Sequence, residues 1–110
     1  MTLTQKRLFG PSAAVTTATD TTAGRYLVPS ATTTIVKQII LCNTASTSAT
    51  VQVAVGTTAT AANRIISDMT LAANETASFN ASLVLATTEK LFFVASATSV
   101  TITVNGVEET

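Results

Sequence analysis

Short runs of β-branched residues, rather than any helical pattern, dominate this sequence. Residues 51–55 alternate valine with smaller or polar side chains, and residues 100–104 alternate valine and isoleucine with threonine. Alternation with a period of two is typical of a strand that buries one face. No amphipathic pattern of period 3.6 lasts long enough for a substantial helix. The sequence therefore predicts an all-β fold.

Two further runs, 33–42 and 91–95, carry apolar side chains at consecutive positions. Such runs are typical of central strands that are covered on both faces. Weaker runs predict shorter strands at residues 13–19, 25–28, 65–67 and 76–80, and residues 59–64 would also tolerate a short helical turn.

Turn-forming residues separate these runs at intervals of about 10 residues. This spacing predicts a single-domain antiparallel β-sandwich, jelly-roll-like, with about eight short strands. The predicted turns lie at Pro29-Ser30-Ala31, residues 43–48, Gly56-Thr57-Thr58, residues 72–75 and Asn105-Gly106.

Residues 1–24 differ from residues 25–110, which we expect to form the sandwich domain. The stretch 16–24 has almost no bulky side chain, so it can bury little apolar surface. The segment is therefore either a partly extended N-terminal arm that orders against a neighbouring molecule or a peripheral edge strand. Leu8 and Phe9 could anchor such an arm.

The surface carries unusually little charge. Charged residues make up 11 % of the chain and the net charge is zero, whereas threonine and alanine account for 42 of 110 residues. Average soluble proteins have about 25 % charged residues, so electrostatic repulsion between copies is weak and a homo-oligomer is expected. Six scattered Lys and Arg residues do not form the basic stripe that nucleic acid requires.

No segment has the apolar length of a signal peptide or of a membrane span, so we expect synthesis in the cytoplasm and no membrane partner. The chain also lacks histidine, the usual base for a serine or cysteine nucleophile. Metal-ligand clusters and phosphate loops are absent from the sequence. We therefore predict a protein that is not an enzyme and that uses no cofactor or metal.

The remaining reactive groups have structural interpretations. Cys42 lies in an apolar run and is expected to be a small buried residue. The pair Glu108-Glu109 is expected to stay in water. The other carboxylates fall at or near predicted turns, where solvated acids are normal: Asp20, Asp68, Glu75 and Glu89.

The order of these features resembles that of small tailed-bacteriophage virion proteins of the β-sandwich type, which decorate or cement capsids or serve as tail-associated components. The resemblance covers residues 25–108 and consists of strands and turns, so it carries over no binding residue. Relatives often have Gly-Glu-Thr where this chain has Asn74-Glu75-Thr76. The other matching segments are Arg25-Tyr26-Leu27-Val28-Pro29, residues 34–39, Cys42-Asn43-Thr44, residues 51–56, 62–65, 83–85 and 91–97, and Val100 to Glu108.

The resemblance implies a virion structural protein, a capsid decoration or cement subunit that binds the major capsid protein or other virion proteins. Its location would then be the virion. Two alternatives stay open: a component of the tail or of the head–tail junction, and a carbohydrate- or receptor-binding module. Sugar binding usually needs exposed aromatic rings, and Phe79, Phe92 and Phe93 are expected in the core. Candidate partner contacts are Leu8, Phe9, Thr57, Thr58 and Asn63.

Overall fold

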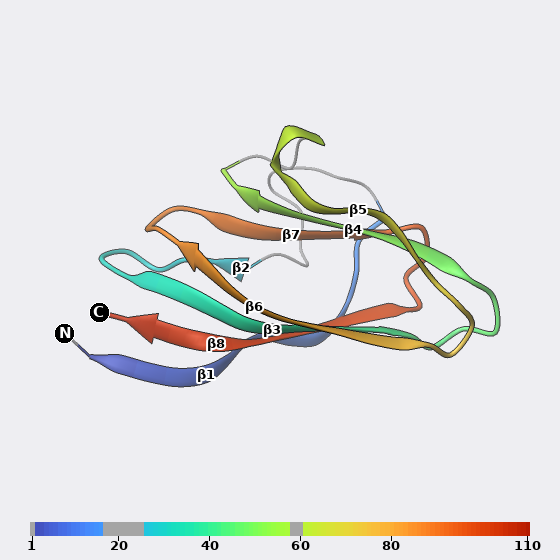
Figure 1. The fold of residues 1–110 in the computed structure, drawn as a ribbon, viewed down its shortest axis with the longest axis horizontal. Coiled ribbons are helices and arrows are strands. Elements are labelled where there is room, and N and C mark those ends of the chain that lie inside the picture. Colours follow the sequence, from blue (N-terminus) through green and yellow to red (C-terminus); the bar gives the residue numbers. More distant parts are fainter. Residues whose placement is uncertain (1, 17–25, 58–60) are drawn as a thin grey trace.

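The computed structural model describes residues 2–16, 26–57 and 61–110. They form two antiparallel four-stranded sheets that face each other as a sandwich (Figure 1). The predicted all-β sandwich of eight strands is confirmed. The first sheet has the order β1 (Leu3–Ala13), β8 (Val100–Glu109), β3 (Thr33–Asn43), β6 (Thr76–Leu85). The second has the order β2 (Tyr26–Leu27), β7 (Lys90–Ala95), β4 (Ala49–Gly56), β5 (Arg64–Leu71), with a short 3-10 helix, η1 (Ala61–Asn63), before β5.

The strand pairs follow a simple rule. β1 pairs with β8, β2 with β7, β3 with β6 and β4 with β5. The chain is therefore one long hairpin that turns between β4 and β5 and is folded so that successive pairs fall in alternate sheets. This is the strand order of a jelly roll. At the open end of the hairpin, Thr2 and Thr110 exchange two backbone hydrogen bonds of 2.8 and 2.9 Å, so the two ends lie side by side (Figure 1).

The core lies between the sheets and consists of aliphatic side chains with a few aromatic rings. In β8 the buried Val100, Ile102 and Val104 alternate with partly exposed threonines, as the sequence predicts. Phe9 of the first sheet stacks on Phe93 of the second, with ring centroids 5.3 Å apart. The largest fully buried side chains are Phe93, Ile39, Leu41, Leu71, Leu85, Leu91, Ile102, Val36, Val51, Val53, Val100 and Val104.

The central strand β3 is irregular at Lys37. Both of its neighbours shift register between Val36 and Gln38, so Lys37 lies in a β-bulge. The bulge changes the phase of the strand, and both Val36 and Ile39 face the core although three positions separate them.

The structure of β3 corrects two predictions, the cover of both faces of this strand and the burial of Cys42. β3 is central, but its two faces are not equally covered, because Ile35, Ile40 and Cys42 alternate outward and stay partly exposed. Cys42 is therefore only half-buried. The prediction of cover on both faces is right for β7, where Leu91 and Phe92 are both buried.

The predicted turn at Asn105-Gly106 is wrong, since both residues lie within β8. A Cβ atom at Gly106 would lie only 2.3 Å from the Ile35 carbonyl oxygen and 2.8 Å from Leu8 Cδ1. Asn105 Nδ2 donates a hydrogen bond of 3.2 Å to Gln38 Oε1 across the same bulge. The glycine is thus required by close packing beside the bulge, not by a change of chain direction.

The N-terminal segment also differs from the predicted strand at 13–19. Leu3–Ala13 forms the edge strand β1 along β8. Of the two alternatives that the sequence left open, an extended arm and an edge strand, this part of the chain is an edge strand. Val15 then makes an isolated parallel bridge to Val94 in the second sheet. Residues 17–19 lie outside the described residues. β5 and β6 are longer than predicted, and the helical turn that residues 59–64 allow is present as η1.

Two turns of the same design flank β6. In Ala72–Glu75 and in 86–89, the glutamate backbone N–H donates to the alanine carbonyl at 3.1 Å, and its carboxylate accepts from the alanine N–H at 2.7 Å. The third residue has positive φ in both, 58° at Asn74 and 76° at Thr88. Asparagine tolerates the left-handed region well, whereas a β-branched residue is strained there.

Replacing Thr88 by asparagine should therefore stabilise the protein by about 0.5–1 kcal/mol, because the second turn then matches the first. The free energy of unfolding, measured by urea denaturation, checks this. The reciprocal variant, Asn74→Thr, should lose a similar amount. Equal stability of Thr88→Asn and the original chain would contradict the strain at Thr88.

A fully buried amide, Asn43, joins three loops at one end of the sandwich. Its Nδ2 lies within hydrogen-bonding distance of the carbonyl oxygens of Thr47 (2.8 Å), Ala72 (3.1 Å) and Leu71 (3.4 Å). Its Oδ1 accepts from the Ala45 N–H and the Ser99 hydroxyl, each at 3.1 Å. The β3–β4, β5–β6 and β7–β8 connections thus share one side chain.

We expect Asn43→Leu to destabilise the fold by about 3 kcal/mol, because buried carbonyl and N–H groups lose their partner. Urea unfolding measures the loss. Gln5→Ala, which removes an exposed amide from β1, is the matched control and should change stability by less than about 0.5 kcal/mol. A similar small effect for Asn43→Leu would show that the three loops do not depend on this amide.

Candidate interaction surface

The outer face of the first sheet carries an exposed apolar row. Ile35 of β3 pairs with Val107 of β8 on one side and with Val84 of β6 on the other. We call these three residues the Ile35 row. Val84 is 65 % exposed, and Ile35 and Val107 are partly exposed. The adjacent row is formed by amides, since Gln38 pairs with Asn105 and Asn80. Basic residues border both rows: Arg7 of β1 pairs with Asn105, and Lys6 and the bulge residue Lys37 line one hollow with Asn105 and Val107. No acidic residue belongs to either row.

The edge strands differ in how well they are protected against pairing with another chain. β1 carries Lys6, Arg7 and Pro11 and has two register shifts along β8. β5 carries Arg64 and Asp68 and also shifts register, and β2 has only two residues. β6 has ten residues without charge, proline or glycine, and one register shift along β3, between Asn80 and Leu83. Charges, proline and bulges are the usual protections of an edge, so among the described strands β6 is the long edge with the fewest of them.

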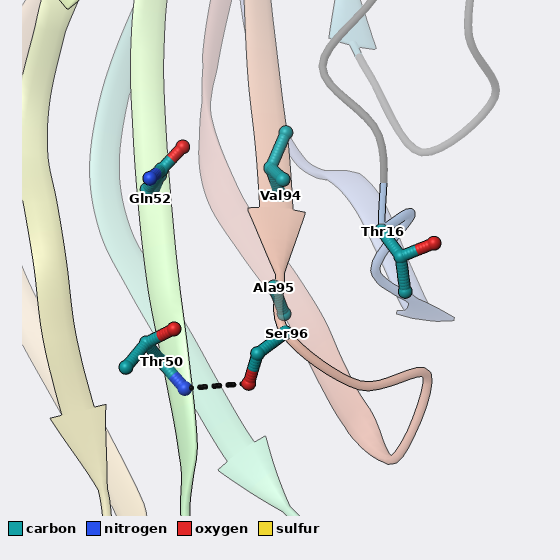
Figure 2. A pocket seen from close by; sticks show the side chains of 6 residues that line it. All are labelled: Thr16, Thr50, Gln52, Val94, Ala95 and Ser96. Atoms are coloured by element: carbon teal, nitrogen blue, oxygen red, sulfur yellow. Dashed lines mark hydrogen bonds between the residues drawn. The ribbon is translucent and has the colours of Figure 1, made fainter.

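A shallow hollow lies on the outer face of the second sheet, where β4 and β7 run side by side (Figure 2). Ser96 Oγ accepts a hydrogen bond of 2.9 Å from the Thr50 N–H, and Gln52 Nε2 donates one of 2.6 Å to Asp68. The lining offers hydroxyl and amide groups but no aromatic ring on which a sugar could stack. The residues that line it are Thr16, Thr50, Gln52, Val94, Ala95 and Ser96.

A polar network joins both sheets near the chain ends and corrects the expectation that Glu108 stays in water. The Tyr26 hydroxyl of β2 donates a hydrogen bond to Glu108 of β8, and the Thr34 hydroxyl lies 2.8 Å from the Tyr26 hydroxyl. Lys6 of β1 forms a 3.1 Å ion pair with Glu108, whose side chain is only 12 % exposed. Strands β2 and β1 supply Tyr26 and Lys6 as the partners of Glu108, which its position in the sequence did not reveal.

The network shifts the pKa values of its two acidic groups in opposite directions. The hydrogen bond from Tyr26 lowers the pKa of Glu108; burial opposes this, and Lys6 adds to the lowering. Burial, together with the hydrogen bond to Glu108, raises the pKa of Tyr26 to about 12. The structure thus favours an ionised Glu108 beside a neutral Tyr26.

The predicted contact residues do not share one position in the fold. Leu8 and Phe9 are partly buried on β1 and pack against the core, Leu8 over Gly106 and Phe9 on Phe93. Thr57 is exposed in the bend after β4, and Asn63 is partly buried at the end of η1.

Thr58 lies outside the described residues. The sequence reasoning missed the β6 edge and the Ile35 row. The available signal was the uncharged stretch 76–85, of which only residues 76–80 were assigned to a strand.

Comparison with protein-family models, with curated proteins and with solved structures finds no match to this chain. Within residues 2–16, 26–57 and 61–110, no group of three or more Cys, Asp or Glu residues is arranged to hold a metal ion. The same part of the chain has no helix long and apolar enough to cross a membrane.

Glu108→Gln tests the polar network through its pH dependence. Because folding lowers the pKa of Glu108 from its ordinary 4.5, the ionised network stabilises the fold fully above that pH and progressively less as the pH falls through the folded pKa. We expect Glu108→Gln to lose about 1–3 kcal/mol near neutral pH and to be less sensitive to acid than the original chain. Urea unfolding at a series of pH values measures both effects.

Glu109→Gln is the matched control, because it removes the adjacent carboxylate without touching Tyr26 or Lys6. It should keep the acid sensitivity of the original chain. An identical pH profile for Glu108→Gln and Glu109→Gln would contradict the role of the network.

Proposed function

We propose that this protein is a non-enzymatic structural subunit of a virus particle, a capsid decoration or cement protein. The observation that carries the proposal is the outer face of the first sheet, where the Ile35 row is exposed beside a row of amides and is bordered by Lys6 and Lys37. Contiguous exposed apolar residues rimmed by polar ones are typical of protein–protein contact sites. This face suits packing against another protein.

The viral setting of the proposal rests on the sequence resemblance to tailed-bacteriophage virion proteins. The jelly roll is compatible with that setting, because viral capsid proteins use it, but lectins and cupins use it as well. Fold alone therefore does not determine function. The partner in this proposal is the lattice of the major capsid protein.

The mechanism is additive. Each subunit buries a modest apolar area at roughly 25 cal/mol per Å², and many subunits on one lattice sum these contributions. The low charge of the chain limits repulsion between neighbouring copies. A shell covered in this way resists internal pressure without any chemical turnover by the subunit.

The second candidate is a component of the tail or of the head–tail junction, which the same surface would serve equally well. A carbohydrate-binding role has the hollow of Figure 2 in its favour, since hydroxyl and amide groups can bind sugar hydroxyls. Its lining lacks the aromatic ring that sugar sites commonly use, so we rank this role last among the binding functions.

Mass spectrometry of separated heads and tails from purified particles tests the location. The proposal expects the chain in the head fraction at a fixed ratio to the major capsid protein. Recovery only from tails would support the second candidate, and absence from both fractions would overturn the virion role.

Binding to capsids that lack the protein tests the surface. Val107→Lys places a charge in the Ile35 row and should weaken binding at least about tenfold, because an interface that buries an unpaired ammonium group loses more than about 1.4 kcal/mol. Thr70→Lys is the matched control, since Thr70 is an exposed strand residue of β5 in the other sheet. Equal binding of the two variants would show that another face meets the capsid.

A further inference from the structure

We propose that β6 is a self-association edge, to which a second copy of this chain adds its own β6 in antiparallel orientation. The two-fold axis would pass near Asn80, and the two first sheets would join into one eight-stranded sheet. This interface differs from the capsid-binding face, and it holds for the isolated protein whether or not the protein decorates a capsid.

The backbone of β6 supplies the first argument. β3 pairs with one side of β6, and no described strand pairs with the other (Figure 1). Most of its ten residues are exposed. A free edge presents N–H and C=O groups that can extend the sheet, and β6 lacks the charges and proline that protect β1.

Symmetry and charge favour a second copy as the occupant. An antiparallel strand is complementary to itself under a two-fold rotation, so each contact occurs twice. β6 itself has no charged residue, and the Lys37 ammonium that β3 places on Ser82 is the charge beside it among the described contacts. With the axis at Asn80, the two Ser82 positions are four residues apart, so the two ammonium groups do not face each other.

The side chains also fit this pairing. When two copies of one strand pair, residues of the same face meet only if the numbers of the paired residues differ by an even number. Pairs placed symmetrically about Asn80 meet this condition. β6 shifts register along β3 between Asn80 and Leu83, but the less exposed residues Ala77, Phe79 and Leu83 still lie an even number of positions apart. Phe79 then faces Ala81 of the second copy and Ala77 faces Leu83, so a large side chain meets a small one. Thr76 would lie beside Val84, which is 65 % exposed in the single chain and stays on the outer face. Cross-strand pairs of this kind contribute roughly 0.2–1 kcal/mol each.

The pairing has a geometric consequence for the proposed capsid contact. A two-fold axis perpendicular to the joined sheet leaves both outer faces on the same side. Two Ile35 rows would then face one partner surface, so the dimer would bind a lattice through two sites at once.

Sedimentation of the purified full-length protein over a range of concentrations tests the self-association. We expect a dimer, and we expect Asn80→Lys to weaken it at least tenfold because two ammonium groups would meet at the axis. Gln5→Lys adds the same charge to β1, at the opposite edge of the same sheet, and should leave the dimer intact. Circular dichroism shows whether each variant is folded.

A monomeric original chain at every concentration, or equal dimerisation of the folded Asn80→Lys and Gln5→Lys variants, would overturn the proposal. Either result would leave the capsid-binding test above unaffected. A monomer that still binds capsids would refute only the β6 pairing. A dimer that does not bind capsids would refute only the capsid role.

Cysteine cross-linking tests the register in a Cys42→Ser background. Asn80→Cys should form an intermolecular disulfide, because the two introduced residues face each other across the axis. Ser78→Cys is the control, since its two copies would lie four residues apart, about 13 Å, beyond disulfide reach. Equal cross-linking of both variants would overturn the pairing at Asn80.

Discussion

The β-bulge at Lys37 is the constraint on which the first sheet depends. β3 lies at the centre of that sheet, and a regular strand could not turn both Val36 and Ile39 toward the core. The extra residue restores the inward phase for the second half of the strand. It also sets the positions around it: Gly106 packs closely on Ile35 because no side chain intervenes, and Ile35 faces outward between Val84 and Val107. The proposed contact face is thus a consequence of the same irregularity that completes the core.

Two polar sites set the positions of the loops and outer strands, which apolar packing alone does not determine. Burial of Val, Leu and Ile side chains is strong but non-directional, so it does not by itself position the loops or the outer strands. Asn43 holds three connections at one end, and Glu108 joins Tyr26 and Lys6 near the chain termini. Buried polar groups must find partners, and the geometry of those partners is specific. Both sites therefore tie strands of the jelly roll to one arrangement.

The few charged residues of the chain are unevenly distributed over the sheet edges. The charged groups on these edges lie on β1 and β5, whereas β6 has none of its own and has only the Lys37 ammonium of β3 beside it among the described contacts. One surface therefore combines an unprotected edge with an exposed apolar row, which is the combination that multi-copy packing uses. The candidate contacts chosen from sequence, Leu8 and Phe9, instead serve the core, because β1 turns them inward against Gly106 and Phe93.

The sequence by itself determined the β class, the approximate places of seven strands and the sandwich, because period-two alternation and turn residues act locally. It could not distinguish Asn105-Gly106 in a strand from the same pair in a turn, since the reason for the glycine is the backbone of β3, about 70 residues earlier in the chain. Likewise, Glu108 at the end of the chain reads as a solvated acid until Tyr26 and Lys6 are placed beside it. The exposed β6 edge and the Ile35 row were decided only by the tertiary structure, because strand order determines which strand lies at an edge and which residues become neighbours across a sheet.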